Sequence, residues 1–206
     1  MKYARRLSLA AGIVMALMVV AGVATASASS GVLCSTATNP CNSRWPTGTV
    51  LDLSLKSGTS AKFATTSGEA LETCNSSTLK GKLTSNSAGG EAAVENAELT
   101  WGGCNFPTNT LKRGKFRTNS TGSGNGTLYL IEEIEITISH PIFGSCTYLI
   151  IIETDLGTWN ATTGVLSVNA VGKKSGGSLA CPETAKLTAE YVKTEPSTTT
   201  LYVSNG

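Results

Sequence analysis

The amino-acid sequence predicts an all-β fold, an antiparallel β-sandwich or, as the alternative, a β-barrel, stabilised by disulfide bonds. Three observations support this prediction. Apolar and polar residues alternate in many short segments, which is the period-2 signature of half-buried strands. Turn-forming clusters rich in Gly, Ser and Asn separate these segments, and six cysteines are spread along the chain. Many short strands divided by Gly-rich turns are typical of sandwiches and barrels.

The expected strands follow one another along the chain. Leu51, Leu53 and Leu55 alternate with polar neighbours and predict the first. The one segment that could form a helix, residues 91–98, is short, and its apolar residues fit the period of a strand as well as that of a helix. We therefore predict a strand there too. Further strands are expected at residues 79–83, 97–101, 127–139, 147–153, 166–170, 187–191 and 201–203. The separating turns lie at residues 57–58, 87–90, 122–126 and 175–177.

The N-terminus has the pattern of an export signal. A basic start is followed by an apolar run over residues 7–23 and then by the small residues Ala26-Ser27-Ala28. This pattern predicts a cleaved signal peptide at 1–28 and a single secreted β domain at 29–206. No cysteine sits at the cleavage point and no apolar tail closes the chain, so we expect no stable membrane anchor and an extracellular protein.

The charge balance argues against polyanion binding by the chain as a whole. Removing residues 1–28 takes away three of the 16 basic residues and none of the 14 acidic ones, which leaves a net charge near −1. A near-neutral chain has no global attraction for nucleic acid or for anionic membranes. We therefore expect no nucleic-acid partner.

The cysteines predict structural disulfides. An even number in an exported chain favours three bridges, and the sequence alone permits 15 connectivities. The local pairing joins each cysteine to the next one along the chain. No C-x-x-C pair is present, so a zinc site and a thioredoxin-type redox site both lack their basic motif. The expected bridges are Cys34–Cys41, Cys74–Cys104 and Cys146–Cys181.

One acidic stretch, residues 127–140, invites a catalytic interpretation. In an extended strand Glu133 and Glu135 share a face with Cα atoms about 6.6 Å apart, within the range of glycosidase carboxylate pairs, roughly 5–9.5 Å. Such a pair needs unequal environments, however, and two neighbours on one polar stripe show no sign of them. The chain's only histidine, His140, has no Ser/Asp partner motif. We therefore assign no catalytic, cofactor-binding or metal-ligating residue, expect no cofactor, and favour a non-enzymatic protein over an atypical hydrolase.

A structural role explains the glutamates more simply. Residues 111–117 are strongly basic, and a flexible Gly/Ser/Asn loop joins them to the acidic stretch. A hairpin between the two would place Glu132 opposite Lys112 or Arg113, depending on a one-residue shift in register. Opposite charges across a strand pair stabilise it and help to select the register. The glutamates would also neutralise much of the basic segment's field.

The aromatic residues offer a possible sugar-stacking platform. Trp101 and Tyr191 end alternating apolar rows, which favours the core. Trp45 and Trp159 lie beside turn residues, so we predict that these two are exposed and available for ligand stacking.

The C-terminal half carries an ordered series of short motifs. Ser145-Cys146-Thr147-Tyr148 is followed by Cys181-Pro182 and then by Ala189-x-Tyr191. This series resembles a group of uncharacterised exported proteins of high-G+C Gram-positive bacteria, and the likeness covers roughly residues 74–203. The resemblance implies a secreted bacterial β domain with a Cys146–Cys181 link, and it brings no catalytic residue with it.

Three classes of function follow from these observations. The leading expectation is a secreted, non-enzymatic surface, matrix or protein-interaction module whose partner is a glycan or an extracellular protein. The alternatives are a carbohydrate-binding module that uses Trp45 and Trp159, and an atypical hydrolase built on Glu133 and Glu135.

Overall fold

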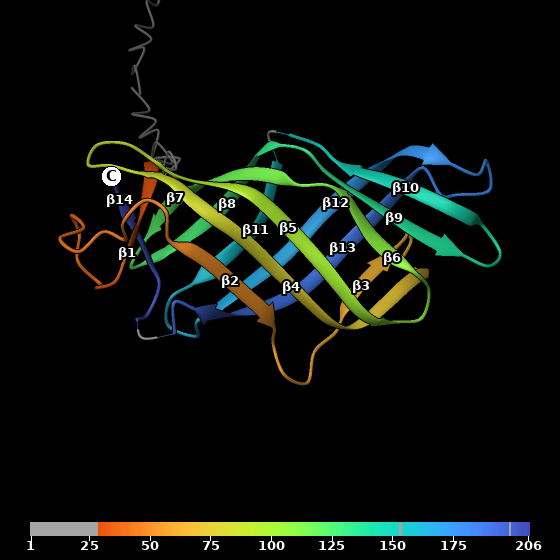
Figure 1. The fold of residues 1–206 in the computed structure, drawn as a ribbon, viewed down its shortest axis with the longest axis horizontal. Coiled ribbons are helices and arrows are strands. Elements are labelled where there is room, and N and C mark those ends of the chain that lie inside the picture. Colours follow the sequence, from red (N-terminus) through yellow and green to blue (C-terminus); the bar gives the residue numbers. More distant parts are fainter. Residues whose placement is uncertain (1–28, 153, 198) are drawn as a thin grey trace, which may run out of the picture.

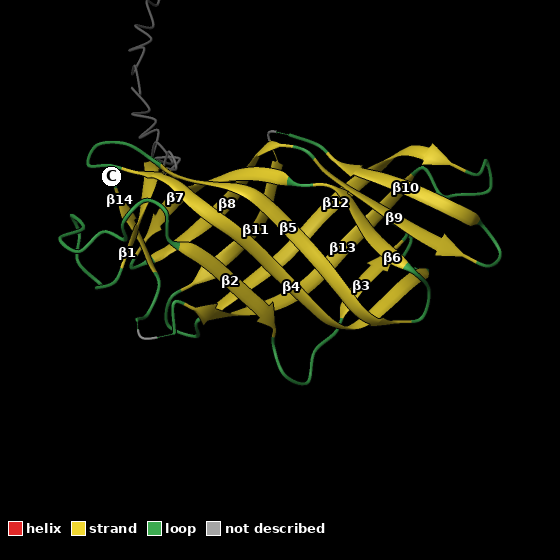
Figure 2. Cartoon of the chain, viewed as in Figure 1, coloured by secondary structure: helices red, strands yellow, loops and turns green. Residues whose placement is uncertain are grey.

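The computed structural model describes residues 29–152, 154–197 and 199–206, so the predicted signal peptide lies outside the described residues. Every regular element in this part of the chain is a β-strand (Figure 2), which confirms the all-β prediction. The strands are β1 (Ser29–Cys34), β2 (Val50–Leu55), β3 (Ala61–Ala64), β4 (Ala70–Asn86), β5 (Ala92–Cys104), β6 (Thr108–Lys112), β7 (Gly114–Gly122), β8 (Asn125–Glu132), β9 (Ile134–His140), β10 (Gly144–Ile150), β11 (Thr154–Asn160), β12 (Val165–Gly177), β13 (Thr184–Glu195) and β14 (Tyr202–Asn205).

The strands form one antiparallel sheet that closes on itself. From β4 the hydrogen-bonded order runs through β5, β7, β8, β11 and β12 to β13. Both β2 and β3 then pair with β13 on one side and with β4 on the other. Figure 1 shows β2, β4 and β5 in a front layer that crosses β11, β12 and β13 behind it. The result combines the two layers of a sandwich with the continuous pairing of a barrel.

The core lies between these layers and follows the alternation of the sequence. Along β13, for example, Ala185, Leu187, Ala189 and Tyr191 are buried while the residues between them face outward. The same alternation along the long strands β4, β5 and β12 supplies most of the remaining core. Burial of such apolar side chains contributes roughly 25 cal/mol per Å² removed from water, and it is the main source of the sheet's stability.

The acidic stretch forms two strands rather than the single strand that the alternation predicts. The chain breaks at Glu133, because β8 pairs with β7 and β11 whereas β9 pairs with β6 and β10. Gly114 lies against this bend, where a Cβ atom would collide with the side chain of Ile134. Leu130 and Ile134 are both fully buried, so even-numbered residues face the core on both sides of the break. Glu132, at the bend, is exposed.

The three disulfides are those of the local pairing, and no described cysteine is free. Cys74 and Cys104 are direct cross-strand partners in β4 and β5. Cys34–Cys41 closes the loop after β1, and Cys146–Cys181 ties β10 to the loop before β13. Three such bridges are typical of a protein that works in an oxidising, extracellular environment. In the described part of the chain, no helix has the length and apolar character needed to cross a membrane.

The burial of Tyr191 predicts a specific response to alkaline pH. Desolvation raises the pKa of its phenol to about 12, although a 2.8 Å hydrogen bond with the Ser77 hydroxyl acts in the opposite direction. The pKa in the unfolded chain is about 10, so the folded state holds this proton more tightly. The resulting contribution to stability is complete below pH 10 and is lost as the pH rises towards 12. In a spectrophotometric titration, the difference between wild type and Tyr191→Phe should therefore show one phenol that ionises only near pH 12. A folded protein in which that phenol ionises near pH 10 would contradict the burial.

Candidate functional site

The two glutamates of the hydrolase hypothesis have separate partners. Glu133 accepts a 2.8 Å hydrogen bond and ion pair from Lys112, and this contact raises the pKa of that lysine. Glu135 instead accepts a 3.0 Å hydrogen bond from the hydroxyl of Ser175 on β12. Each carboxylate is therefore held by its own neighbour. The described contacts do not assemble the two into a shared site with an acid and a base in contrasting environments.

The predicted hairpin forms between β7 and β8, but its predicted register is wrong. Glu132 lies opposite Lys115, not opposite Lys112 or Arg113. The reason is that the basic segment is itself divided at Arg113. Before this residue, β6 pairs with β9; after it, β7 pairs with β8. Lys112 therefore belongs to a different strand pair from the rest of the basic segment.

Most of the basic segment is neutralised by glutamates in β5, next to β7, and at the residue just before β5. Carboxylate and cation approach within 3.4 Å or less in three ion pairs: Glu91–Arg117, Glu95–Lys115 and Glu98–Arg113. The Glu95 contact raises the pKa of Lys115 and lowers that of Glu95. The predicted source of the neutralising charge is therefore wrong for three of the four basic residues, because only Lys112 pairs with a glutamate of the acidic stretch. The sequence signal for the other three partners was the matching order of charges in residues 91–98 and 113–117.

His140 stabilises a turn. Its Nδ1 accepts hydrogen bonds from the backbone N–H groups of Ile142 (3.2 Å) and Phe143 (3.3 Å). Its ring stacks on Phe143 and meets Phe106 edge-on, both at a centroid distance of 4.5 Å. These contacts account for the histidine at the end of β9 without a catalytic role.

The prediction that Trp45 and Trp159 are exposed is wrong, since they are only 4% and 3% exposed. The Trp159 indole N–H donates a 3.0 Å hydrogen bond to the carbonyl of Leu201, because this end of β11 is covered by the C-terminal segment. Trp45, in the connection between β1 and β2, packs into the core, and the Lys193 ammonium lies 5.7 Å from its ring centroid. Neither ring can therefore offer a face to a sugar.

The other two aromatic predictions have different outcomes. Tyr191 is fully buried, as predicted. Trp101 is only partly buried, and it packs against the edge of the core with its ring 5.1 Å from that of Phe63. Its indole N–H donates to the hydroxyl of Thr110 on β6, at 3.1 Å. Trp101 therefore joins β5 to β6, two strands that lie side by side.

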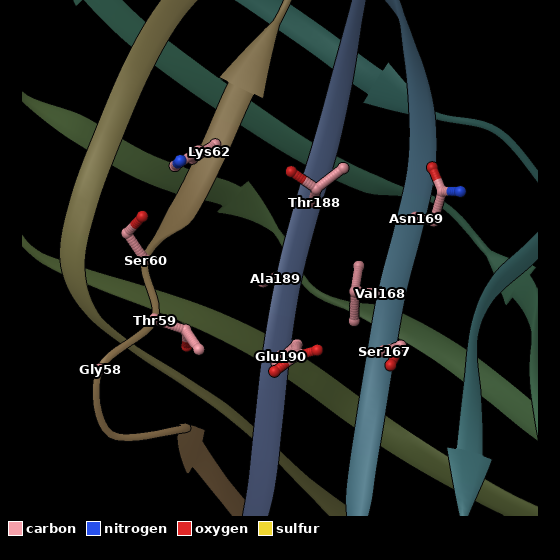
Figure 3. Close-up of a pocket in the computed structure, with 10 residues that line it drawn as sticks. All are labelled: Gly58, Thr59, Ser60, Lys62, Ser167, Val168, Asn169, Thr188, Ala189 and Glu190. Atoms are coloured by element: carbon pink, nitrogen blue, oxygen red, sulfur yellow. The ribbon is translucent and has the colours of Figure 1, made fainter.

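An open groove of about 570 Å³ lies on the outer face of β3, β12 and β13. Figure 3 shows it between the loop at Gly58 and the outward side chains of the two long strands. Val168 and Ala189 border the groove through the strands, but both residues are buried and belong to the core. The remaining side chains in the lining are polar: Thr59, Ser60, Lys62, Ser167, Asn169, Thr188 and Glu190.

The groove follows from the topology of two short strands. Because β2 and β3 both lie between β4 and β13, the chain must leave the sheet between them, and residues 56–60 form a loop over its outer face. The Lys56 N–H donates to the Glu190 carbonyl at 2.8 Å, and the Lys56 ammonium contacts the Glu190 carboxylate, also at 2.8 Å. The Thr59 hydroxyl donates to the Lys56 carbonyl at 2.7 Å. The loop is thus held in place and forms a preformed wall.

The side chains that line the groove are suited to binding a polar ligand through hydrogen bonds. Four hydroxyl groups and one amide can each donate and accept hydrogen bonds, and Lys62 adds a positive charge. The one carboxylate in the lining, Glu190, is engaged by Lys56. Across the described residues, no cluster of three or more His, Cys, Asp or Glu side chains is arranged to hold a metal ion. The groove was not predicted from the sequence. Of the predicted turns, the one at residues 57–58 marks the loop that forms the groove's wall.

Comparisons of the chain with protein-family models, with curated protein sequences and with solved structures found no match.

Proposed function

We propose that this chain is a secreted, non-enzymatic interaction module that binds a polar extracellular partner through the groove on β3, β12 and β13. The observation that carries this proposal is the groove itself, an open recess of about 570 Å³ with a polar, hydroxyl-rich lining and a tethered wall. Such a surface can make many hydrogen bonds to a glycan or to an extended polypeptide without reorganising, and preformed sites lose less entropy on binding.

Other features of the molecule agree with this role. Cys74–Cys104 restrains β4, the neighbour of β3, and Cys146–Cys181 restrains the loop that leads into β13, as suits a protein exposed to the extracellular medium. The separate partners of Glu133 and Glu135 favour a binding function over hydrolysis. Because Trp45 and Trp159 are buried, we expect a ligand to be held by hydrogen bonds and not by stacking on these rings.

The proposal predicts that filling the groove abolishes binding. Thr188 points outward from β13 into the groove, so Thr188→Trp should block it while leaving the core intact. The matched control is Thr100→Trp, at an exposed outward position of β5 away from the groove. Wild type and both variants, secreted and fully oxidised, are applied to an array of purified polysaccharides. We expect dose-dependent binding that Thr188→Trp lowers at least tenfold and Thr100→Trp leaves unchanged. Equal binding by both variants would refute the groove as the site.

A further inference from the structure

Three lysines without an ion-pair partner gather on the outer face beside the groove. In β7 and at the residue just before it, three basic side chains each have their own glutamate: Arg113, Lys115 and Arg117. Lys56, Lys80, Lys112 and Lys174 also have carboxylate partners. Among the described residues, six basic side chains have no carboxylate within ion-pair distance. Arg44, Lys82 and Lys193 are unpaired at separate places in the fold. Lys62, Lys173 and Lys186 lie together on the outer face of the strands that carry the groove.

The strand registers place these lysines on one diagonal line. Lys62 on β3 lies opposite Thr188, two residues from Lys186 on β13. Lys186 in turn lies opposite Val171, two residues from Lys173 on β12, with the shift in the same direction. Diagonal neighbours on adjacent strands are about 7–8 Å apart, so the three Cα atoms follow a row roughly 15 Å long. We call Lys62, Lys186 and Lys173 the lysine row.

The partners across the strands do nothing to offset these charges. Lys62 lies between Thr73 and Thr188, both uncharged. Lys186 lies between Ala64 and Val171, and Lys173 lies between Thr184 and Leu149; these partners are uncharged as well. The nearest carboxylate in the groove, that of Glu190, is already held by Lys56 at 2.8 Å. The row therefore presents a local excess of positive charge on a chain that is close to neutral overall.

Protection of a sheet edge does not explain the row. Lysines often blunt the exposed edges of sheets and so prevent pairing with other chains. Each of these three lysines, however, belongs to a strand with hydrogen-bonded neighbours on both sides. The row runs across paired strands and begins at Lys62, inside the groove. Its position fits a ligand that passes through the groove and continues along the sheet.

We propose that the lysine row and the groove together bind an acidic polysaccharide, a chain with a carboxylate, sulfate or phosphate group about every 7–8 Å. The anionic groups lie against the three ammonium groups, and the hydroxyl-rich lining bonds the sugar hydroxyls of the segment inside the groove. This inference rests on the proposed function and adds the charge class of the ligand. Because the ammonium groups are exposed, the attraction is screened within about 8 Å at physiological salt, and binding weakens as salt is added.

The test compares purified polymers with two triple variants. Polygalacturonate supplies carboxylates, dextran sulfate supplies sulfates, a glycerol-phosphate polymer supplies phosphates, and dextran is the neutral control. The variant Lys62→Gln/Lys173→Gln/Lys186→Gln removes the row. The matched control, Arg44→Gln/Lys82→Gln/Lys112→Gln, changes the net charge equally at exposed positions elsewhere. Affinities are measured by biolayer interferometry at 50 and 300 mM NaCl, with full-length secreted protein.

We expect at least one acidic polysaccharide to bind more tightly than dextran and to lose at least tenfold in affinity in the row variant. The control triple variant should stay within twofold of wild type. The single variant Lys173→Gln should fall by about threefold, because Lys173 lies in the row but outside the groove lining. The acidic polymer that binds identifies whether carboxylate, sulfate or phosphate is the recognised group.

Several outcomes would overturn the inference. Equal losses in the two triple variants would mean that only net charge matters, and tighter binding to double-stranded DNA than to any polysaccharide would assign the row to another class of ligand. If Thr188→Trp abolishes binding on the array but the row variant does not, the lysine row is not part of the site and the proposed function stands. If neither variant changes binding, both proposals fail.

Discussion

Replacing Glu72 with alanine is expected to lower the free energy of unfolding by about 3–5 kcal/mol. The Glu72 side chain is only 1% exposed, and its carboxylate is surrounded by hydrogen-bond donors. It accepts backbone N–H groups from Thr73 (2.6 Å), Asn105 (2.8 Å) and Phe106 (2.8 Å), as well as the Thr108 hydroxyl (3.4 Å). The variant would leave the N–H groups of Thr73 and Phe106 without this acceptor, while Asn105 and Thr108 would keep only their second acceptors, the carbonyls of Thr73 and Phe106. The loop between β5 and β6 should therefore lose its anchor.

Chemical denaturation of the oxidised protein measures this effect, with two further variants as controls. Glu69→Ala removes an exposed glutamate just before β4 and should change stability by no more than about 0.5 kcal/mol. Glu72→Gln keeps the shape of the side chain but turns an amide group towards donors, so it should fall between wild type and Glu72→Ala. A loss below about 1 kcal/mol for Glu72→Ala would show that the loop finds other partners.

Removing the disulfide between Cys74 and Cys104 is expected to cost about 3–4 kcal/mol. The bridge spans 30 residues, and a loop of that length restricts the unfolded chain considerably. The double variant Cys74→Ala/Cys104→Ala leaves no unpaired thiol and keeps the cross-strand register of β4 and β5. Thermal unfolding against wild type gives the loss, and Cys34→Ala/Cys41→Ala, which opens a loop of only seven residues, should cost less.

The Cys74 bridge and Glu72 hold the same loop, so their effects should not simply add. Cys104 precedes Asn105, whose N–H is bound by Glu72. Once one restraint is lost, the other has less ordered structure to stabilise. We expect the combined variant to lose at least 1 kcal/mol less than the sum of the separate losses. Strict additivity would contradict a shared role for the two restraints.

Local sequence patterns predict the class of fold, and the simplest local pairing of the cysteines, one of 15 connectivities that the sequence permits, is the one observed. Alternation along residues 187–191 reports directly which side chains face the core, since the period of a strand is two whatever its neighbours are. The bridge between Cys74 and Cys104 also agrees with a local pairing, because the two cysteines lie on strands that are adjacent in both sequence and space.

Features that depend on which strands become neighbours were beyond those patterns. The register of Glu132 was mispredicted because the chain breaks at Arg113 and sends Lys112 to a different strand pair. Trp45 was expected at the surface because its sequence neighbours are turn residues. Its burial arises from a contact across the fold, in which the Asn86 amide bonds to the carbonyls of Leu33 and Trp45. The groove likewise needs both β2 and β3 to lie between β4 and β13, an arrangement that no single segment encodes.

The most direct test of the interaction face is the protection of individual lysines from acetylation when the tightest-binding acidic polysaccharide is bound. The oxidised protein is labelled briefly with and without the polymer, and mass spectrometry gives the rate at each lysine. We predict that labelling of Lys62, Lys173 and Lys186 slows at least fivefold, while Lys82 and Lys112 react at unchanged rates. Uniform slowing of all five, or protection confined to Lys82 and Lys112, would contradict a binding face on β3, β12 and β13.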